Sequence, residues 1–200
     1  MKNIPNQLTV SRVLLIFVFV ALSAFDSKNP NCFYAPERVS YIFHFIAVII
    51  ALIAGLTDLL DGYLARKMKA ESDFGRLIDP LADKILVLAT FTMMVAYSMI
   101  PGWFLIVILT REFMVTGLRT LASAKGIVIA ADRWGKLKTA LQMFMLAVGG
   151  CAWIHLFGFS IAGGAPRILW LCLMSVVAFV TVASGLGYFI KYKKLYLGSI

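Results

Sequence analysis

Four aspartates form two closely spaced pairs in the first half of the chain. Asp58 and Asp61 are three residues apart, and Asp79 and Asp83 are four residues apart. On an α-helix these spacings separate the members of a pair by about 60° and about 40°, so each pair faces one side of its helix. Carboxylates held this close repel one another unless cations lie between them. Ligands that offer only oxygen favour hard divalent ions, so we expect Mg²⁺ or Mn²⁺, with two ions at the site.

The residues around the two pairs suit a ligand that carries phosphate. Gly62 directly follows Asp61, where a missing side chain lets a ligand approach the backbone. Ala65 is small and lies close to the same face, Arg66 offers a fork of donors for phosphate oxygens, and Gly75 either turns the chain or leaves space. Each of these residues alone is typical of ordinary helix packing or of a turn. Together with the metal ligands they indicate a diphosphate bound through a metal ion.

Helix capping and ion pairing are the alternative interpretation of the same acids. Asp79 precedes Pro80, a pattern typical of an N-cap followed by proline at the first helical position. Arg66, Arg76 and Lys84 are the cations available for pairing. One cap does not account for two carboxylate pairs, so we favour the metal site and expect the cap as an additional role of Asp79.

The composition is that of an integral membrane protein. Hydrophobic residues make up 61% of the 200 residues, charged residues make up 14%, and the mean hydropathy is +0.88. Apolar runs recur at about the 20 residues that a bilayer crossing requires, at 8–25, 40–62, 77–98, 102–121, 138–157 and 167–190. We therefore expect an all-α bundle of six transmembrane helices that forms a single domain, 1–200.

Two short segments complete this expected architecture. The segment from Lys2 to Arg12 is expected to be amphipathic and to lie along the membrane interface. The stretch Gly62–Ile78 is expected to be a basic turn that brings two helices back antiparallel. The four aspartates would then converge between neighbouring helices at one membrane face.

The distribution of Lys and Arg predicts the orientation. With six crossings, fourteen of the nineteen Lys and Arg fall on the side of the two termini, and only Lys28, Arg38 and Arg167 fall on the other. The positive-inside rule therefore places both termini, and the aspartates, on the cytoplasmic side. The net charge of +9 is explained by loops that face anionic lipid and phosphate-bearing substrates, and we expect no nucleic acid partner.

A second group of charged residues is expected near the metal site. Arg111 and Arg119 are eight residues apart, about 80° around a helix, and Lys136 and Lys138 lie where the next apolar run begins. Four cations suit an acceptor molecule that carries its own phosphate. Positive-inside topology explains Arg119, Lys136 and Lys138 equally well. Arg111 lies deeper, and for it an ion pair with neighbouring acids is the alternative.

The aspartate region resembles the signature of the CDP-alcohol phosphotransferase family. The matching string is Asp58-x2-Asp61-Gly62-x2-Ala65-Arg66-x8-Gly75-x3-Asp79-x3-Asp83. The resemblance implies a six-helix membrane bundle, usually a homodimer, with a metal site open to the cytoplasm. It implies that Asp58, Asp61 and Asp79 hold the metals and that Asp83 joins the site and acts as the base. The residues that would shape the pocket of the CDP donor are Gly62, Ala65, Arg66 and Gly75.

Three further stretches resemble the bacterial branch of this family that makes phosphatidylglycerophosphate: Asn3–Arg12, Arg111–Arg119 and Gly135–Thr139. The resemblance implies CDP-diacylglycerol as donor, sn-glycerol 3-phosphate as acceptor, and a bacterial cytoplasmic membrane enzyme of lipid biosynthesis. Inositol phosphate, serine and phosphatidylglycerol stay open as acceptors, inositol phosphate above all because it also carries a phosphate. A carrier that passes cations through the aspartates is the alternative from another class. Against it, the acids lie at one membrane face rather than at the midplane.

Overall fold

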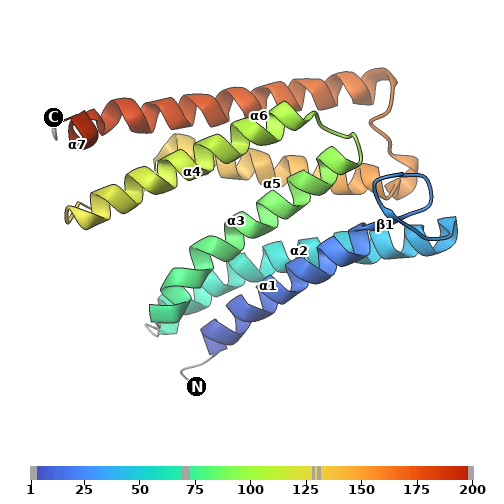
Figure 1. The fold of residues 1–200 in the computed structure, drawn as a ribbon, viewed down its shortest axis with the longest axis horizontal. Coiled ribbons are helices and arrows are strands. Elements are labelled where there is room, and N and C mark those ends of the chain that lie inside the picture. The colour runs from blue at the N-terminus through green and yellow to red at the C-terminus, as the bar shows by residue number, and fades with distance from the viewer. Residues whose placement is uncertain (1–3, 69–72, 128, 130–131, 198–200) are drawn as a thin grey trace. The chain divides into compact units, whose positions relative to one another are not determined.

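The apolar runs of the sequence fold as long α-helices in a computed structural model of the chain (Figure 1). The structure describes residues 4–68, 73–127, 129 and 132–197, with side chains for 10–55, 57, 84–127, 129, 132–193 and 195–197. Its helices are α1 (Ile4–Ser23), α2 (Glu37–Met68), α3 (Asp73–Ala96), α4 (Gly102–Ala124), α5 (Arg133–Trp153), η1 (Leu156–Gly158), α6 (Gly164–Lys191) and α7 (Lys193–Leu197). Each predicted apolar run overlaps one of the helices α1 to α6, so the prediction of a helical protein is confirmed.

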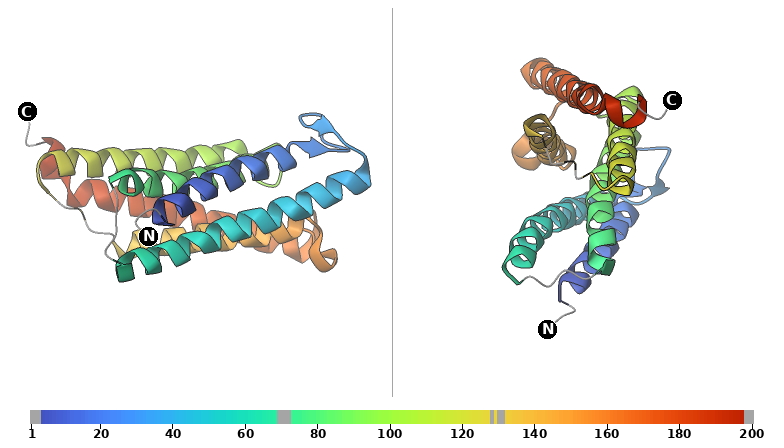
Figure 2. Two further views of the ribbon diagram at one scale, coloured as in Figure 1. Left: turned by 90° about the horizontal axis from the view of Figure 1, so that it is seen from below. Right: turned by 90° about the vertical axis from the view of Figure 1, so that its left-hand side faces the viewer.

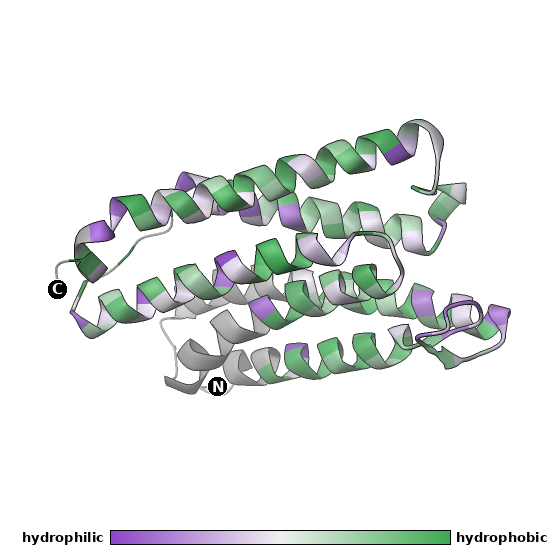
Figure 3. Cartoon of the chain, turned by 45° about the horizontal axis from the view of Figure 1, so that its top comes forward, coloured by the Kyte–Doolittle hydropathy of each residue, from purple (hydrophilic) through white to green (hydrophobic). Residues whose placement is uncertain are grey.

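Among the described residues, two helices are long enough and apolar enough to cross a membrane, judged by length and composition alone. They are Glu37–Gly55 of α2 and Gly164–Lys191 of α6, and Val10–Ser23 and Lys84–Ala96 are shorter apolar helices. Only 28% and 33% of the most apolar 18-residue stretch of these two helices is buried, whereas the core helix of a water-soluble domain is mostly buried. Figure 3 shows that apolar residues make up most of the coloured helices. Large side chains such as Phe17, Phe113 and Phe179 are exposed there, as lipid contact requires.

The helices divide into two compact units. Unit 1 comprises Met1–Met99 and Ala147–Phe159, and unit 2 comprises Ile100–Leu146 and Ser160–Ile200. In unit 1, α1 packs along both α2 and α3 (Figure 2). The core between them is formed by Ile16, Ala54 and Leu86, one residue from each helix. Arg12, the last residue of the segment expected along the membrane interface, lies in α1 with only 1% of its surface exposed.

Two local expectations about the helix ends differ from the structure. The described part of the segment from Lys2 to Arg12 is continuous with the first apolar run, because α1 runs without a break from Ile4 to Ser23, and its place at the membrane interface stays a prediction. Asp79 is no N-cap, because α3 begins at Asp73 and Pro80 lies inside it. The expected turn Gly62–Ile78 is largely helical, since α2 continues to Met68. Good helix formers such as Leu, Ala, Arg, Lys and Met fill the end of α2, and its cations favour a helix C-terminus.

A polar cluster closes the end of unit 1 at the loop between α1 and α2. That loop contains β1 (Phe25–Asp26) and β2 (Phe33–Tyr34), which pair in parallel. The Tyr97 hydroxyl donates to the carbonyl oxygen of Ser23 at 2.8 Å and lies 3.0 Å from His44 Nε2. His44 Nε2 is also 2.9 Å from the carbonyl oxygen of Phe25, and the His44 ring stacks on Trp153 at 4.4 Å. One tyrosine therefore ties α1, α2 and the loop together.

Replacing Tyr97 with Phe should destabilise unit 1. The change removes a hydroxyl that joins two helices and leaves the Ser23 carbonyl without that donor, a loss worth about 1–3 kcal/mol. Thermal unfolding in detergent should show a lower melting temperature, by about 2–4 °C per kcal/mol for a chain of this size. Tyr34→Phe is the control, because Tyr34 is 79% exposed. Equal melting of the two variants would contradict a structural role for the Tyr97 hydroxyl.

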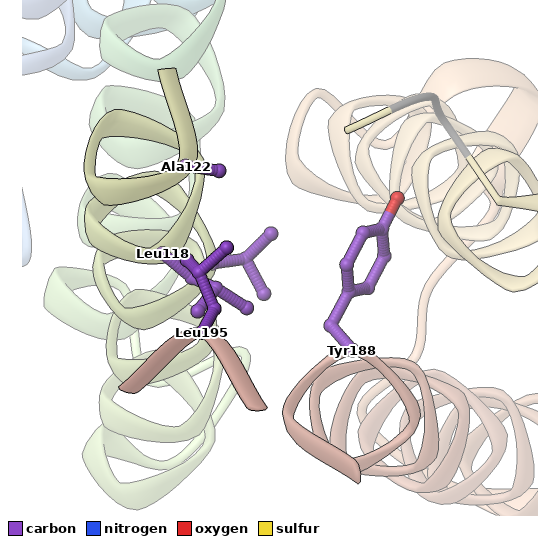
Figure 4. Packing of buried hydrophobic residues seen from close by; sticks show 5 residues of the cluster. Leu118, Ala122, Tyr188 and Leu195 are labelled. Carbon is purple, nitrogen blue, oxygen red and sulfur yellow. The ribbon is translucent and has the colours of Figure 1, made fainter. Parts of the chain in front are cut away.

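In unit 2, α4 packs along α6. Pro101 precedes α4, and a Schellman motif ends it: Gly126 has φ +72°, and the Ile127 N–H donates to the Ala122 carbonyl oxygen at 2.9 Å. The buried cluster of this unit joins α4, α6 and α7 and consists of Val115, Leu118, Ala122, Tyr188 and Leu195 (Figure 4). This packing fixes the position of Tyr188 on α6.

Candidate active site

The two aspartate pairs lie on helices that contact each other within unit 1. Asp58 and Asp61 lie in α2, and Asp79 and Asp83 lie in α3. Because both stretches are helical, the spacings of three and four residues place each pair on one face of its helix. A set of carboxylate oxygens on two adjoining helices fits Mg²⁺ or Mn²⁺. The backbone is therefore helical where the sequence predicts the two carboxylate pairs, and the metal site itself stays a prediction.

The side chains of this predicted site lie outside the described residues. They are those of Asp58, Asp61, Asp79 and Asp83, together with the predicted donor-binding residues Gly62, Ala65, Arg66 and Gly75. Their roles in metal and donor binding stay predictions from the sequence.

Unit 2 brings three of the four predicted acceptor cations together, and Arg111 of α4 is in the middle of them. Its Nη2 donates to Ser184 Oγ at 2.6 Å, and its guanidinium lies 5.8 Å from the centre of the Tyr188 ring. Its stem crosses α6 at Gly185, where a Cβ atom would lie 3.1 Å from Arg111 Cγ. Glu112 Oε1 is 3.3 Å from Arg111 Nη1, which is the ion pair considered for Arg111 as an alternative. Arg111 thus has an acidic partner, and its contacts with Ser184, Gly185 and Tyr188 hold it against α6.

Arg119, about two turns further along α4, is held by the same tyrosine. Its Nη2 donates to Tyr188 Oη at 3.0 Å, and its guanidinium lies 5.5 Å from the ring centre. Tyr188 Oη also accepts from the backbone N–H of Asp132 at 3.0 Å, just before α5 begins. Figure 4 shows the Tyr188 ring standing off α6 with its hydroxyl directed away from that helix. The tyrosine is 3% exposed, so a buried side chain orders Arg111, the exposed Arg119 and the residue before α5.

Lys138 is the third member of this group, and Lys136 is not. Lys138 is buried at 5% exposure, and its Nζ donates to Glu112 Oε1. Lys136 is exposed and lies two residues away, about 200° around α5, so it faces another side. Gly135 faces the group, since a Cβ there would lie 3.7 Å from both Arg111 Nη2 and Tyr188 Oη. The role of Lys136 stays a prediction from the sequence.

Arg111, Arg119 and Lys138 form what is called here the cation group. Among the described side chains, the Glu112 carboxylate contacts two of them, Arg111 and Lys138. Buried cations are costly without anions, and arginine forks match phosphate oxygens. The positive-inside rule explains cations in cytoplasmic loops, and it does not require that the side chains of Arg111 and Lys138 be buried. The group is therefore suited to a phosphate that carries two charges.

Three members of this arrangement were missed in the sequence: Glu112, Ser184 and Tyr188. A signal for two of them was present, since Ser184 and Tyr188 are polar residues four apart in an otherwise apolar run. Glu112 was visible only as the neighbour of Arg111. No spacing rule connects α4 with residues about seventy positions later, so only the packing of α4 on α6 shows the contacts.

Comparison with known proteins defines the class. Residues 2–183 match the CDP-alcohol phosphatidyltransferase family, and the chain belongs to that family. Several relatives named CDP-diacylglycerol–glycerol-3-phosphate 3-phosphatidyltransferase are similar along almost their whole length. The one from Bacillus subtilis is 38% identical over 195 residues, covering 96% of this chain and 95% of the relative. Those from Haemophilus influenzae and Rickettsia typhi are 37% identical over 193 residues (93% and 91% covered) and 34% over 196 (94% and 96%).

Replacing Tyr188 with Phe should loosen the cation group without removing its ring. Arg119 Nη2 and the Asp132 N–H both lose the oxygen that accepts from them, and each such part-buried hydrogen bond is worth about 0.5–1.5 kcal/mol. The measurement is the melting temperature in detergent beside Tyr192→Phe, the matched control whose ring stacks on Tyr188 at 6.2 Å. A Tyr188→Phe variant that melts no lower than Tyr192→Phe would exclude the hydroxyl as an organising contact.

Proposed function

We propose that this chain transfers the phosphatidyl group from CDP-diacylglycerol to sn-glycerol 3-phosphate, giving phosphatidylglycerophosphate and CMP. The observation that carries the proposal is similarity over 93–96% of the chain to relatives named for this reaction. The cation group supports the choice of acceptor independently. An acceptor without net charge, such as serine, would leave the charge of its donors unused, whereas a phosphate dianion would pair with them. The cation-carrier alternative has no observation in its favour.

The aspartates would hold the metal and one of them would move a proton. Asp58, Asp61 and Asp79, joined by Asp83, would bind Mg²⁺ or Mn²⁺, and a bound ion neutralises charge on the diphosphate of the donor. Asp83 accepts the proton from the terminal hydroxyl of the acceptor. That hydroxyl oxygen then forms a bond to the phosphorus nearest the diacylglycerol, and the bond to the departing CMP breaks. Gly62, Ala65, Arg66 and Gly75 would shape the pocket of the donor.

The cation group would bind the phosphate of the acceptor. Arg111 offers its guanidinium from a position fixed by Ser184 and Tyr188, and Arg119 is ordered by the same tyrosine. Lys138 adds a buried ammonium group. Because these donors are already ordered, binding loses little side-chain entropy. Inositol phosphate carries the same group, so it is the competitor that the assay must include.

The membrane setting follows from the substrate. The acyl chains of the donor remain in the bilayer. An enzyme built of membrane-embedded apolar helices can therefore bind the donor without extracting it from the membrane. We propose six crossings with both termini cytoplasmic, in agreement with the Lys and Arg distribution, in a bacterial cytoplasmic membrane. Homodimer formation belongs to the same proposal and rests on the family resemblance.

The test of the function is CMP release by purified protein supplied with CDP-diacylglycerol and a panel of acceptors. We expect turnover with sn-glycerol 3-phosphate, none after chelation, and recovery with Mg²⁺ or Mn²⁺. Calcium should restore little, because its larger and looser shell displaces the reacting oxygens. Faster turnover with inositol phosphate or serine would overturn the acceptor, and full activity after exhaustive chelation would overturn the metal role.

Arg119→Ala should impair acceptor binding specifically. A lost charged hydrogen bond is worth about 1.5–3 kcal/mol, so the KM for sn-glycerol 3-phosphate should rise about ten- to a hundredfold while the donor KM changes little. Arg133→Ala is the matched control, because it removes an exposed cation from the first residue of α5. Equal effects of the two variants would assign Arg119 to topology rather than to phosphate binding.

Asp83→Asn should separate proton transfer from donor binding. The amide keeps the shape and one carbonyl oxygen but cannot accept the proton, so turnover should fall by about two orders of magnitude or more. Donor binding, measured by calorimetry with Mg²⁺, should persist. Asp61→Asn should weaken donor binding together with turnover, because it removes a metal ligand. Near wild-type turnover by Asp83→Asn would exclude this residue as the base.

A further inference from the structure

Three buried polar atoms of unit 2 have no hydrogen-bond partner within the part of the chain that the structure describes. They are Arg111 Nε, Gln142 Nε2 and Thr181 Oγ1. Gln142 lies in α5 and is 1% exposed, and Thr181 lies in α6 and is 0% exposed. Buried polar groups are nearly always paired, and an unpaired one is especially costly inside an apolar layer. The three atoms therefore point to a partner that the described residues do not supply.

The Thr181 hydroxyl differs from those of two other helical threonines. Thr90 and Thr139 each donate to the carbonyl oxygen four residues earlier, at 2.8 Å and 3.1 Å. This local bond is common for a threonine inside a helix, and it pairs the hydroxyl without any outside group. Thr181 lacks the bond, so its hydroxyl is available to a group outside α6.

The register of α5 against α6 brings Gln142 and Thr181 to about the same level. A Cβ built at Gly135, near the start of α5, would lie 3.7 Å from Tyr188 Oη, near the end of α6. The other ends of the two helices are joined through residues 154–163, so the helices run antiparallel. Gln142 comes seven residues after Gly135, and Thr181 comes seven residues before Tyr188. Seven residues make about two turns and return to nearly the same face, so both side chains lie on the facing sides.

The same two faces carry contacts of the cation group. Lys138 lies on α5 four residues before Gln142, and Ser184, which accepts from Arg111 Nη2, lies on α6 three residues after Thr181. Three residues rise about 4.5 Å along a helix. That rise is comparable with the separation between the phosphate and the middle hydroxyl of a glycerol phosphate. The unpaired groups are therefore about one turn from the donors that the proposed function assigns to the acceptor phosphate.

We propose that Gln142 and Thr181 bind the middle hydroxyl of the acceptor while Arg111 and Lys138 bind its phosphate. The proposal rests on the proposed function. The hydroxyl oxygen accepts from Gln142 Nε2 and the hydroxyl hydrogen is donated to Thr181 Oγ1, so each unpaired group gains a partner. Arg111 Nε donates to an oxygen of the phosphate. The ligand class is a phosphate ester of a short polyol, with a hydroxyl on the carbon next to the one that bears the phosphate.

An ordered water molecule is the simpler occupant of the same position. Water also donates and accepts, and it commonly pairs buried polar groups that the chain leaves unsatisfied. A structural water makes Gln142 and Thr181 serve folding alone, so their replacement would affect every acceptor alike. A bound hydroxyl of the acceptor makes the effect depend on whether the acceptor has that hydroxyl.

The experiment compares two acceptors by CMP release, sn-glycerol 3-phosphate and 3-hydroxypropyl phosphate. The second keeps the phosphate and the terminal hydroxyl that reacts, and it lacks only the middle hydroxyl. In kcat/KM the wild type should prefer sn-glycerol 3-phosphate roughly ten- to a hundredfold, the scale of buried hydrogen bonds left unmade. Gln142→Leu and Thr181→Val should each remove most of this preference. The inhibition constant of inorganic phosphate should not change, because Arg111 and Lys138 remain.

Ser175→Ala is the matched control, because it removes an exposed hydroxyl of α6 that already donates to the Leu171 carbonyl oxygen at 2.8 Å. It should keep the wild-type preference. Equal use of the two acceptors by the wild type would overturn the proposal. A preference that persists in both variants would also overturn it and would assign the two residues to an ordered water. If Gln142→Leu does not fold, Thr181→Val decides, since it replaces the hydroxyl with a methyl group of similar size.

Failure of the proposed function has a different signature. A wild-type protein that releases no CMP with any acceptor would contradict the proposed function by itself. Calorimetry with the same two phosphate esters then tests Gln142 and Thr181 separately. Tighter binding of sn-glycerol 3-phosphate by the wild type, lost in Thr181→Val, is the required result, and no difference in affinity between the two esters would overturn the proposal.

Discussion

The burial of guanidinium charge among apolar helices is the constraint on which the structure of unit 2 depends. A buried cation is tolerated only where dipoles, aromatic faces or anions surround it. Tyr188 supplies two of these for Arg111 and Arg119, through its ring and its hydroxyl oxygen. Its ring also belongs to the apolar cluster that joins α4, α6 and α7. The same side chain therefore packs the unit and compensates its charge, so stability and the proposed anion binding would be coupled there.

The small residues of the unit serve the same constraint. Arg111 can cross α6 only where no side chain stands in its way, and Gly185 provides that place, with a built Cβ only 3.1 Å from Arg111 Cγ. Gly135 lets the first turn of α5 approach Arg111 and Tyr188 at ordinary contact distance. Both glycines lie in regular helices, where any residue could adopt their backbone conformation. Their role is therefore to leave space for the neighbouring side chains.

The sequence predicts what is local and periodic. The apolar runs predicted six long helices, and the spacing of Asp58 and Asp61 predicted one shared helical face; the helices agree with both. Asp79 and Pro80 were misread as a helix start because the pattern is local, whereas α3 gains its first turns from residues before it. Lys136 and Lys138 were grouped although their periodicity separates them by about 200°. The structure follows the periodicity, with one exposed and the other buried.

What the sequence could not predict are contacts between residues far apart in the chain. Nothing in a periodic pattern pairs Tyr97 with Ser23, 74 residues earlier, or Arg119 with Tyr188, 69 residues later. These contacts arise because packing brings polar groups together inside an apolar layer, where each must find a partner. Only the polarity of such residues within an apolar run can be read in advance.

The chemistry of the cation group limits the molecules that it can bind. Among the described side chains, Arg111 and Lys138 contact the carboxylate of Glu112, and Arg119 contacts Tyr188. A neutral alcohol would leave the positive charge of these donors unused. The guanidinium groups held by Ser184 and Tyr188 also prefer oxygens in a defined array over a diffuse charge. In the proposed function, the phosphate of the acceptor, rather than the alcohol that reacts, is therefore the part of the molecule that these residues would recognise.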